Sequence, residues 1–196
     1  MPTWLRFDAS KGGPEPVRVH RLEAHFVFVY SDIVDIRNDC RSVICQLQAT
    51  DKTQAILEVI DSCTIFASLP DIERFKRGVL RRERAQTTGI GHGVAIAHGK
   101  ILGLNEVRIA LGISRDGLEY ESADGMPVHL LFVIASSPSI QMEYLGALSS
   151  ILRSVRTEEM RSHLMDIRLS KSDEACQRFF SMMVQQRFVW FCKDVQ

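Results

Sequence analysis

One short run in this chain combines residue types that could handle phosphate. Residues 84–100 read RAQTTGIGHGVAIAHGK, with three glycines inside five positions and two histidines, His92 and His98. Glycine lets a backbone turn tightly and direct its N–H groups at an anion. A neutral imidazole is nucleophilic near pH 7, so a histidine beside such a loop is a candidate to carry a phosphoryl group.

Other phosphate-binding and metal-binding motifs fit this run poorly. The glycines do not form G-x-G-x-x-G, and Lys100 is followed by Ile101 where a Walker loop needs Ser or Thr. A two-histidine metal site would need further ligands, and no cysteine or carboxylate stands close to His92 and His98 in the sequence. We therefore predict no metal and no other cofactor.

Composition narrows the class of protein. The chain has 196 residues, with 24 basic and 24 acidic side chains and a net charge of zero. This balance argues against a general nucleic-acid binder. The five cysteines are odd in number and irregularly spaced, which favours reduced thiols over a disulfide framework or zinc site.

No part of the sequence predicts insertion into a membrane. No apolar run approaches the roughly 20 residues that a bilayer-spanning helix needs. The first residues, MPTWLRFDASKGGPEP, lack the apolar centre of a secretory signal. The chain is therefore expected to be cytoplasmic.

Two helices and a strand are predicted before the glycine run. Residues 41–49 alternate as a short strand, and Thr50 or Asp51 could cap a following helix. A second helix is expected from Pro70, near its first turn, to Arg84. The apolar faces of the two helices are expected to be Ala55, Ile56, Val59, Ile60 and Cys63, and Ile72, Phe75, Val79 and Leu80.

Strands and helices then alternate to the end of the chain. Strands are expected at 94–98, 107–114 and 127–137, with a hairpin or excursion at 115–125. Helices are expected at 140–154, 157–165 and 171–184, the first with Leu145, Leu148, Ile151 and Leu152 inward. This order predicts an α/β or α+β fold, a sheet covered by helices.

The block RRERAQTTGIGHGVAIAHGK (81–100) resembles the IIA domains of the fructose/mannitol and nitrogen-regulatory class of the sugar phosphotransferase system. In that family an Arg-Glu pair precedes Ser-Thr-Gly-Ile-Gly-Asn-Gly, and Val-Ala-Ile-Pro-His-Gly contains the phosphorylated histidine. Arg82 and Glu83 match the pair. The loop and histidine segment are matched by Thr87, Thr88, Gly89, Ile90, Gly91 and Gly93, and by Val94, Ala95, Ile96, His98 and Gly99.

The resemblance implies a fold, a domain and a partner. The fold is a mixed β-sheet flanked by α-helices. The domain covers residues 38–184, with an N-terminal extension at 1–37 and a C-terminal tail at 185–196. The chain would be a phosphotransferase component whose His98 accepts a phosphoryl group from the phosphohistidine of an HPr-like carrier.

The predicted site follows from the same residues. His98 is the phosphoacceptor, and Arg82 would neutralise the phosphate or position the loop. Hydroxyls and backbone N–H groups of the loop could satisfy the phosphoryl oxygens. The predicted phosphate-binding residues are thus Arg82, Thr87, Thr88, Gly91 and Gly93, with Glu83, His92 and Tyr144 as possible auxiliary residues.

Several positions depart from the family pattern. Ala97 replaces the proline before the histidine, and His92 replaces the asparagine of the loop. Tyr144 stands where a helix after the core strand often carries a second active-site histidine. His129 occupies a position that often holds aspartate or another polar residue, and an apolar strand favours its being packed and hydrogen-bonded.

Three functions remain open at this point. The first is a nitrogen-regulatory phosphocarrier, because no permease segment is found within the 196 residues. The second is a sugar-specific IIA component that donates to a separate permease domain. The third, motivated by Ala97 and Tyr144, is a non-catalytic interaction module. A basic cluster at Arg74, Lys76, Arg77, Arg81, Arg82 and Arg84 is either a solvated face or a docking patch for an acidic partner.

Overall fold

Five strands form one mixed sheet in the order β1-β4-β5-β3-β2. The computed structural model describes residues 42–167. Its strands are β1 (Ile44–Gln46), β2 (Gly89–Gly91), β3 (Val94–Lys100), β4 (Arg108–Leu118) and β5 (Val128–Ser136). Its helices are α1 (Lys52–Ser62), α2 (Ile72–Ala85), α3 (Gln141–Ser154) and α4 (Glu158–Met165), with 3₁₀ turns at Thr64–Phe66 and Pro138–Ile140. The predicted extension at 1–37, the tail at 185–196 and the helix at 171–184 lie outside the described residues.

The pairing of the strands confirms the mixed sheet. β3 runs parallel to β5, with His98 opposite Ile134, and β1 runs parallel to β4. β4 and β5 are antiparallel neighbours, so the segment between them is a hairpin connection, one of the two predicted alternatives. β2 is antiparallel to β3 and forms one edge of the sheet.

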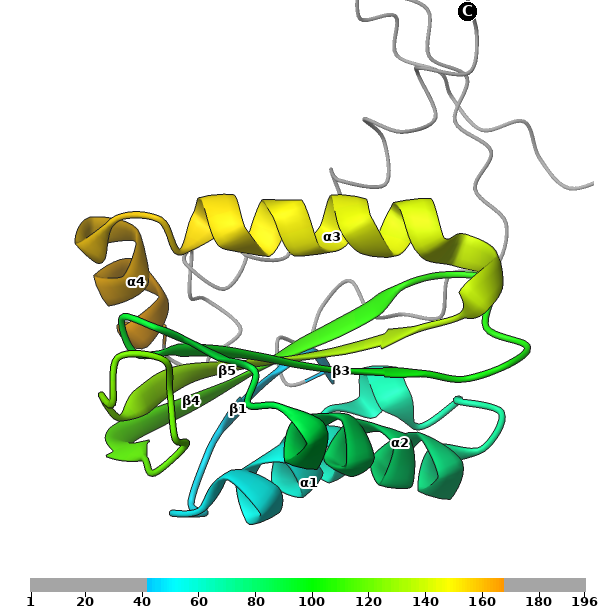
Figure 1. Ribbon diagram of the computed structural model, residues 1–196, viewed down its shortest axis with the longest axis horizontal. Helices are drawn as coiled ribbons and strands as arrows, with labels where there is room; N and C mark the ends of the chain where they lie inside the picture. The colour runs from blue at the N-terminus through cyan, green and yellow to red at the C-terminus, as the bar shows by residue number, and fades with distance from the viewer. Residues whose placement is uncertain (1–41, 168–196) are drawn as a thin grey trace, which may run out of the picture. The chain divides into compact units, whose positions relative to one another are not determined.

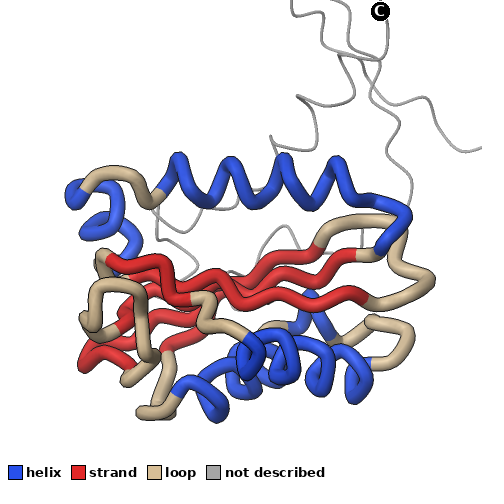
Figure 2. Tube along the Cα trace, viewed as in Figure 1, coloured by secondary structure: helices blue, strands red, loops and turns tan. Residues whose placement is uncertain are grey.

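Helices cover both faces of the sheet. Figures 1 and 2 show α1 and α2 on one face and α3 on the other, with α4 at the end of α3. Alternate residues of β5 therefore enter two separate apolar cores: Leu131 and Val133 pack with α1 and α2, whereas Leu130 and Phe132 pack with α3. A strand buried on both faces reads as a continuous apolar run, which is why 127–137 was recognisable in the sequence.

The first two helices begin at aspartate caps. Asp51 accepts hydrogen bonds from the backbone N–H groups of Thr53 and Gln54, which confirms one of the two predicted caps. In α2 the cap is Asp71, and Pro70 directly precedes it, near the first turn as predicted. The inward residues of both helices are otherwise those expected, with Glu83 added as a buried member of α2.

The predicted inward face of α3 is partly wrong. Leu145 and Leu152 are 45% and 43% exposed, whereas Tyr144 and Ile151 are buried. Successive helical residues are separated by about 100°, so a helix that rests on the sheet along 144, 148, 151 and 155 turns 145 and 152 away from it. The apolar residues of α3 spread over too wide an arc of the helix to show which line contacts the sheet. The buried Tyr144 identifies that line.

Two further findings concern the described residues as a whole. Cys45 and Cys63, the two cysteines within 42–167, are buried free thiols. Over the same residues no helix combines the length and apolar character needed to span a bilayer.

Candidate active site

His98 lies where the edge of the sheet becomes open. β2 pairs with β3 through Gly89 opposite Ala95 and Gly91 opposite Val94, and the Ile96 N–H donates to the Thr88 carbonyl at 3.1 Å. No described strand flanks β3 on that side beyond this bond. The His98 side chain is half-buried there, so its ring is both held by the protein and reachable from outside.

The hydrogen bond of His98 identifies its free nitrogen. Nδ1 lies 3.0 Å from the Ile96 carbonyl oxygen, which can only accept. Nδ1 therefore carries the proton in the neutral ring, and the lone pair is on Nε2. A backbone carbonyl that fixes the tautomer in this way leaves a nucleophilic nitrogen in a defined position.

The surroundings keep this imidazole neutral. Burial is the largest cause of a lowered pKa for His98. The hydrogen bond to Ile96 raises the pKa, the positive charge of Arg82 lowers it, Glu83 raises it, and Lys100 lowers it. The net effect is downward, so the unprotonated, nucleophilic form persists to lower pH than for an ordinary histidine.

Arg82 lies on the helix of the opposite face, near enough for its charge to act on His98. It lies in the last turn of α2, and its Nη1 donates to the Gln86 carbonyl at 2.7 Å. Its positive charge lowers the pKa of His98 and opposes the upward shift that burial gives the pKa of Tyr144. Since His98 and Tyr144 belong to the α3 face, the guanidinium acts across the open edge of the sheet. A guanidinium has five N–H groups, and the bond to Gln86 uses one of them.

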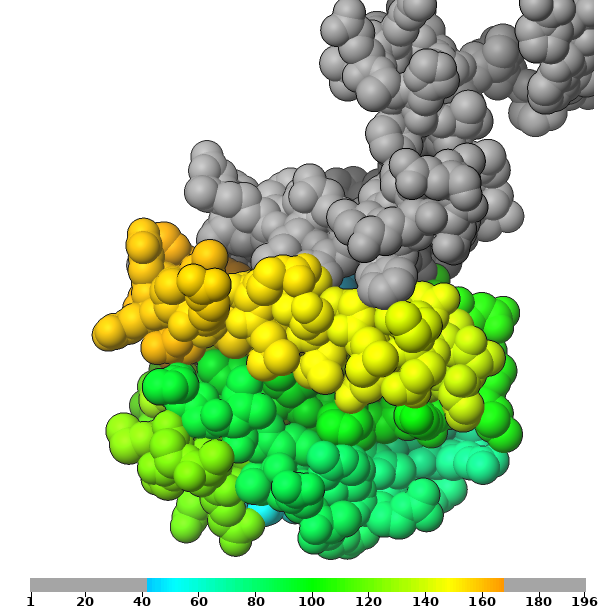
Figure 3. Space-filling model, turned by 45° about the horizontal axis from the view of Figure 1, so that its top comes forward, coloured from blue at the N-terminus to red at the C-terminus, as the bar shows by residue number. Residues whose placement is uncertain are grey.

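Tyr144 of α3 packs beside the ring of His98. Its ring centroid lies 5.7 Å from that of His98, with the ring planes tilted by 47°. Tyr144 is buried, and burial raises the pKa of its hydroxyl, so the phenol stays neutral and able to donate. Figure 3 shows α3, in yellow, along the same face of the molecule as the green α2–β3 region. The structure therefore brings His98, Arg82 and Tyr144 together.

A glycine and a lysine fix the position of β3 between the helices. A Cβ on Gly99 would lie 2.7 Å from Cγ2 of Val79, so this position must be glycine for β3 to rest directly on α2. Lys100 donates from Nζ to Oε1 of Gln141 at 2.9 Å, which ties the end of β3 to the start of α3. The strand carrying His98 is thus held from both faces.

A buried carboxylate anchors the segment before β2. Glu83 is 4% exposed and accepts from the Thr88 backbone N–H at 3.1 Å, from the Thr88 hydroxyl, and from the Tyr120 hydroxyl at 3.3 Å. Burial is the main cause of a raised pKa for Tyr120, and the negative Glu83 adds to it, so Tyr120 remains a donor. The network fastens the end of α2 to residues 87 and 88, which run beside the second half of β3.

The hydroxyls of Thr87 and Thr88 form hydrogen bonds within the protein. The Thr88 hydroxyl is bonded to Glu83, and that of Thr87 donates to the Tyr120 carbonyl and accepts from the Gly89 N–H, both at 3.2 Å. These hydroxyls hold the loop, and a contact between either of them and phosphate stays a prediction. Tyr120 was missed because 37 residues separate it from Glu83 and no local pattern marks it.

The glycine turn lies at the other end of β3. Gly91, His92 and Gly93 have φ values of 90°, 55° and 76°, and the His92 N–H donates to Oδ2 of Asp124 at 2.7 Å. A strand rises about 3.3 Å per residue, so five residues place Gly93 roughly 16 Å from His98. Gly91, His92 and Gly93 thus lie apart from His98 along the strand, and their contact with phosphate stays a prediction. Histidine tolerates a left-handed conformation better than most residues, as does the asparagine it replaces.

His129 is a packed histidine, and the described residues hold no candidate metal site. His129 is half-buried with Nδ1 3.0 Å from the Ser114 carbonyl, as predicted for a packed histidine. Within residues 42–167, no three His, Cys, Asp or Glu side chains are grouped so that they could hold a metal ion. The arrangement at His98 can accept an electrophilic group on Nε2 beside a cation, and it suits an anionic substrate.

Comparison with known proteins gives one family. The model of the family described as "Phosphoenolpyruvate-dependent sugar phosphotransferase system, EIIA 2" matches residues 38–181. The chain is 36% identical over 120 residues, 61% of its length, to the fructose-specific EIIABC component of Bacillus subtilis, of which it spans 19%. It is 28% identical over 123 residues, 63% of its length, to a nitrogen regulatory protein of Bradyrhizobium diazoefficiens, of which it spans 80%.

Solved structures share the fold. The nitrogen regulatory protein IIA-Ntr of Neisseria meningitidis matches with a TM-score of 0.62 and 22% identity, over 74% of this chain and 94% of that one. IIA mannitol of Escherichia coli matches with a TM-score of 0.56 and 17% identity, over 69% of this chain and 96% of that one. These likenesses confirm the mixed-sheet α/β fold.

Proposed function

The chain belongs to the EIIA 2 family of the phosphoenolpyruvate-dependent sugar phosphotransferase system, and on that premise we propose that His98 carries a phosphoryl group received from an HPr-like protein. The observation that carries the proposal is the state of the ring. Nδ1 is held by the Ile96 carbonyl at a half-open edge of the sheet, and no residue within 42–167 forms a hydrogen bond with Nε2. Proteins of this family are phosphotransferase components, which makes phosphoryl transfer the chemistry to expect at such a nitrogen.

The transfer step uses the fixed tautomer. The Nε2 lone pair attacks phosphorus, the N–P bond of the donor phosphohistidine breaks, and its electron pair returns to the donor ring. The His98 proton stays on Nδ1, where the Ile96 carbonyl accepts its hydrogen bond and stabilises the positive charge that develops on the ring. No proton has to leave His98 during the attack.

Arg82 and Tyr144 supply charge and direction. Phosphoryl transfer depends mainly on positioning and on stabilising the charge of the equatorial oxygens. The N–H groups of Arg82 that do not bond Gln86 would donate to the phosphoryl oxygens. The neutral Tyr144 hydroxyl is a second donor, on the α3 side. Tyr144 cannot add a positive charge, so Arg82 carries the electrostatic part.

The regulatory type is the form of carrier we favour. The support is the match to nitrogen regulatory proteins, such as that of Bradyrhizobium diazoefficiens, which is 28% identical over 123 residues and of which the chain spans 80%. Phosphorylation adds negative charge and acceptor oxygens beside Arg82, which would alter the surface that a target protein meets.

A sugar-specific carrier is the second candidate. It is favoured by a fructose-specific EIIA component of Haloferax volcanii, 27% identical over 137 residues and spanned over 89% of its length. The two types are distinguished by supplying phosphorylated protein with the host's permease membranes and fructose. Sugar-dependent loss of the phosphate favours the sugar-specific type, and phosphate retained in the presence of sugar favours the regulatory type.

The direct test is labelling from phosphoenolpyruvate. Purified protein is incubated with labelled phosphoenolpyruvate, enzyme I and the HPr-like carrier of the same organism. We expect acid-labile, base-stable phosphate on the wild type and on the control His129→Gln, and none on His98→Ala. Absence of label on the wild type, or label that persists in His98→Ala, would contradict the proposal and leave the non-catalytic module as the better description.

A further inference from the structure

The outer side of α2 carries a row of unneutralised arginines. Arg74, Arg77, Arg81 and Arg84, here called the basic ridge, are exposed and follow one another at spacings of three, four and three. Such spacings place them along one line of the helix, opposite Phe75 and Val79, which face the core. None of the four forms a salt bridge with a residue in 42–167. The nearby acids are engaged, since Glu73 pairs with Lys76 and Glu83 is buried in its network.

The basic ridge destabilises α2. Like charges at i,i+3 and i,i+4 destabilise a helix by about 0.2–0.5 kcal/mol for each pair. Arg74 also stands in the first turn, where the helix dipole disfavours a cation, although Arg84 in the last turn is favoured by it. No described contact offsets the three like-charge neighbours, so the fold alone gives no reason for the row.

Gly78 is a second feature of α2 that the fold itself does not require. It lies in the middle of α2, where glycine costs about 1 kcal/mol relative to alanine. A Cβ at this position would meet nothing within 4 Å, so packing does not require glycine. Its helical position lies between the ridge and Arg82, on the side of α2 that borders the open edge of the sheet. A missing side chain there leaves room for another surface to approach the helix backbone.

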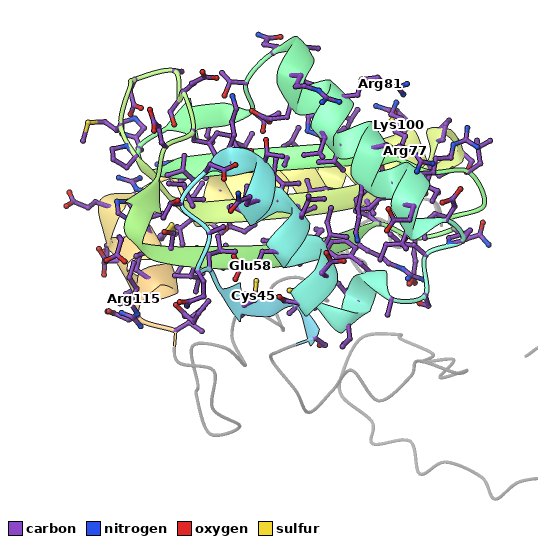
Figure 4. All side chains as sticks on the ribbon, turned by 90° about the horizontal axis from the view of Figure 1, so that it is seen from below. Cys45, Glu58, Arg77, Arg81, Lys100 and Arg115 are labelled. Carbon is purple, nitrogen blue, oxygen red and sulfur yellow. The ribbon has the colours of Figure 1, made fainter. Side chains whose placement is uncertain are left out.

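The ridge lies on the approach to His98. Figure 4 shows Arg77 and Arg81 on one side of the molecule with Lys100, the exposed residue at the end of β3, and Arg115 at the opposite side. Arg82, the next residue after Arg81, is near enough to lower the pKa of His98. A protein large enough to bring a phosphohistidine to Nε2 must cover neighbouring surface, and α2 forms one border of that surface.

We propose that the basic ridge docks an acidic surface of the partner protein that exchanges phosphate with His98, and that Gly78 lets this partner approach α2 closely. The inference rests on the proposed function, since the partner is defined by that exchange. A segregated row of cations in a chain of zero net charge steers an acidic protein and raises its association rate. The ridge thus adds a partner preference that the residues touching phosphate do not supply.

The test measures transfer from the phosphorylated HPr-like carrier of the same organism to His98 at several salt concentrations. In Arg77→Gln/Arg81→Gln we expect KM for the carrier to rise on the order of three- to tenfold at low salt, with kcat unchanged and the salt dependence flattened. The matched control Arg115→Gln, an exposed arginine at the far side, should stay within about twofold of the wild type. Gly78→Leu should raise KM, whereas Gly78→Ala should change it less.

A small donor separates the two proposals. Phosphoramidate has no protein surface, so it should label wild type and Arg77→Gln/Arg81→Gln equally at His98. If neither phosphoramidate nor the carrier labels His98, the proposed function fails. If both label it and KM for the carrier is the same in the double variant at all salt concentrations, the ridge inference is overturned and the carrier function stands. A 20-base-pair DNA duplex that binds the wild type at physiological salt and not the double variant, with KM unchanged, would also overturn it.

The double variant is suited to this test because it should fold. Each of the three like-charge pairs of the ridge includes Arg77 or Arg81, so the double variant removes all three and should leave the thermal unfolding midpoint unchanged or slightly raised. Circular dichroism at the temperature of the transfer assay checks this directly. A raised KM in a variant of unchanged stability supports docking, and a raised KM that tracks lost helicity overturns it.

Discussion

The two ends of β3 have different tasks, although the strand is only seven residues long. At its start the chain is paired with β2, turns through Gly91, His92 and Gly93, and is tied to Asp124. At its end the strand edge is open, and His98 stands between a tyrosine from α3 and an arginine from α2. The closed end sets the register, and the open end leaves a nitrogen that a partner can reach. The contrast teaches that rigidity and reactivity are supplied by separate parts of one strand.

The largest expected effect compares the two histidines of this segment. His98→Ala should abolish transferable phosphate, because it removes the accepting nitrogen. His92→Asn should retain transfer near the wild-type rate, since asparagine also tolerates the left-handed conformation and His92 lies at the closed end. Labelling from phosphoenolpyruvate measures both. Equal loss in the two variants would break the distinction between the ends.

The next effect concerns the cation at the open end. Arg82→Gln should lower kcat/KM for phosphoryl transfer by roughly 10²-fold, the scale seen when a donor to developing charge is removed. It should also raise the pKa of His98, because the positive charge of Arg82 lowers it. Imidazole NMR titration and transfer kinetics check the two results. An unchanged pKa with unchanged kinetics would show that Arg82 does not act at this site.

The closed end should respond in stability and not in transfer. Gly91 and Gly125 both have positive φ, 90° and 70°, but a Cβ on Gly91 would lie 3.0 Å from Oδ2 of Asp124, whereas one on Gly125 meets open space. Gly125→Ala should cost about 1 kcal/mol of unfolding free energy for its backbone conformation. Gly91→Ala should cost more, through the additional contact. Chemical denaturation gives the difference, and a slower transfer at saturating carrier in the folded variants would contradict the division of tasks.

The smallest effect concerns the buried network around Glu83, which joins the end of α2 to residues 87 and 88. Tyr120→Phe removes the hydroxyl that donates to Glu83 and should cost on the order of 1 kcal/mol of stability. Glu83→Gln should cost more, about 1–3 kcal/mol, since its amide cannot accept all the donors that converge there. Thermal unfolding measures both. If Tyr120→Phe proved the more costly, the carboxylate would not be the centre of the network.

Acid pH should slow phosphoryl transfer at the open end. The pKa of His98 is lowered in the folded protein, so transfer to Nε2 should remain near its maximum until the pH falls below the ordinary value for histidine, and decline only at more acid pH. The sign follows because protonation occupies the lone pair that attacks phosphorus. A rate that fell already between pH 8 and 7 would contradict a lowered pKa for the acceptor.

Sequence reasoning succeeded where one local pattern decides the structure. The cap at Asp51, the apolar face of α1 and the buried β5 each follow from a few neighbouring residues. His98 and Arg82 belong to one continuous block of sequence, and their roles there stay predictions. The face of α3 was not, since Leu145 and Leu152 compete with Tyr144 for the contact line and only the sheet beneath the helix decides.

The partners of the loop could not be predicted from spacing. Tyr120 meets Glu83 only because β4 and α2 are brought together by the sheet. Gly91 and His98 look adjacent in a line of sequence letters, but an extended strand places them far apart. Secondary structure decides which residues of a sequence motif can share one site. The spacing of the residues in the sequence does not show this.

The central claim is that phosphate is carried on Nε2 of His98, and nitrogen-15 NMR of the phosphorylated protein tests it directly. With imidazole nitrogens labelled, phosphorus coupling should appear at Nε2 of His98, while Nδ1 keeps its proton and its hydrogen bond to the Ile96 carbonyl. Coupling at Nδ1, or at the ring of another histidine, would contradict the account.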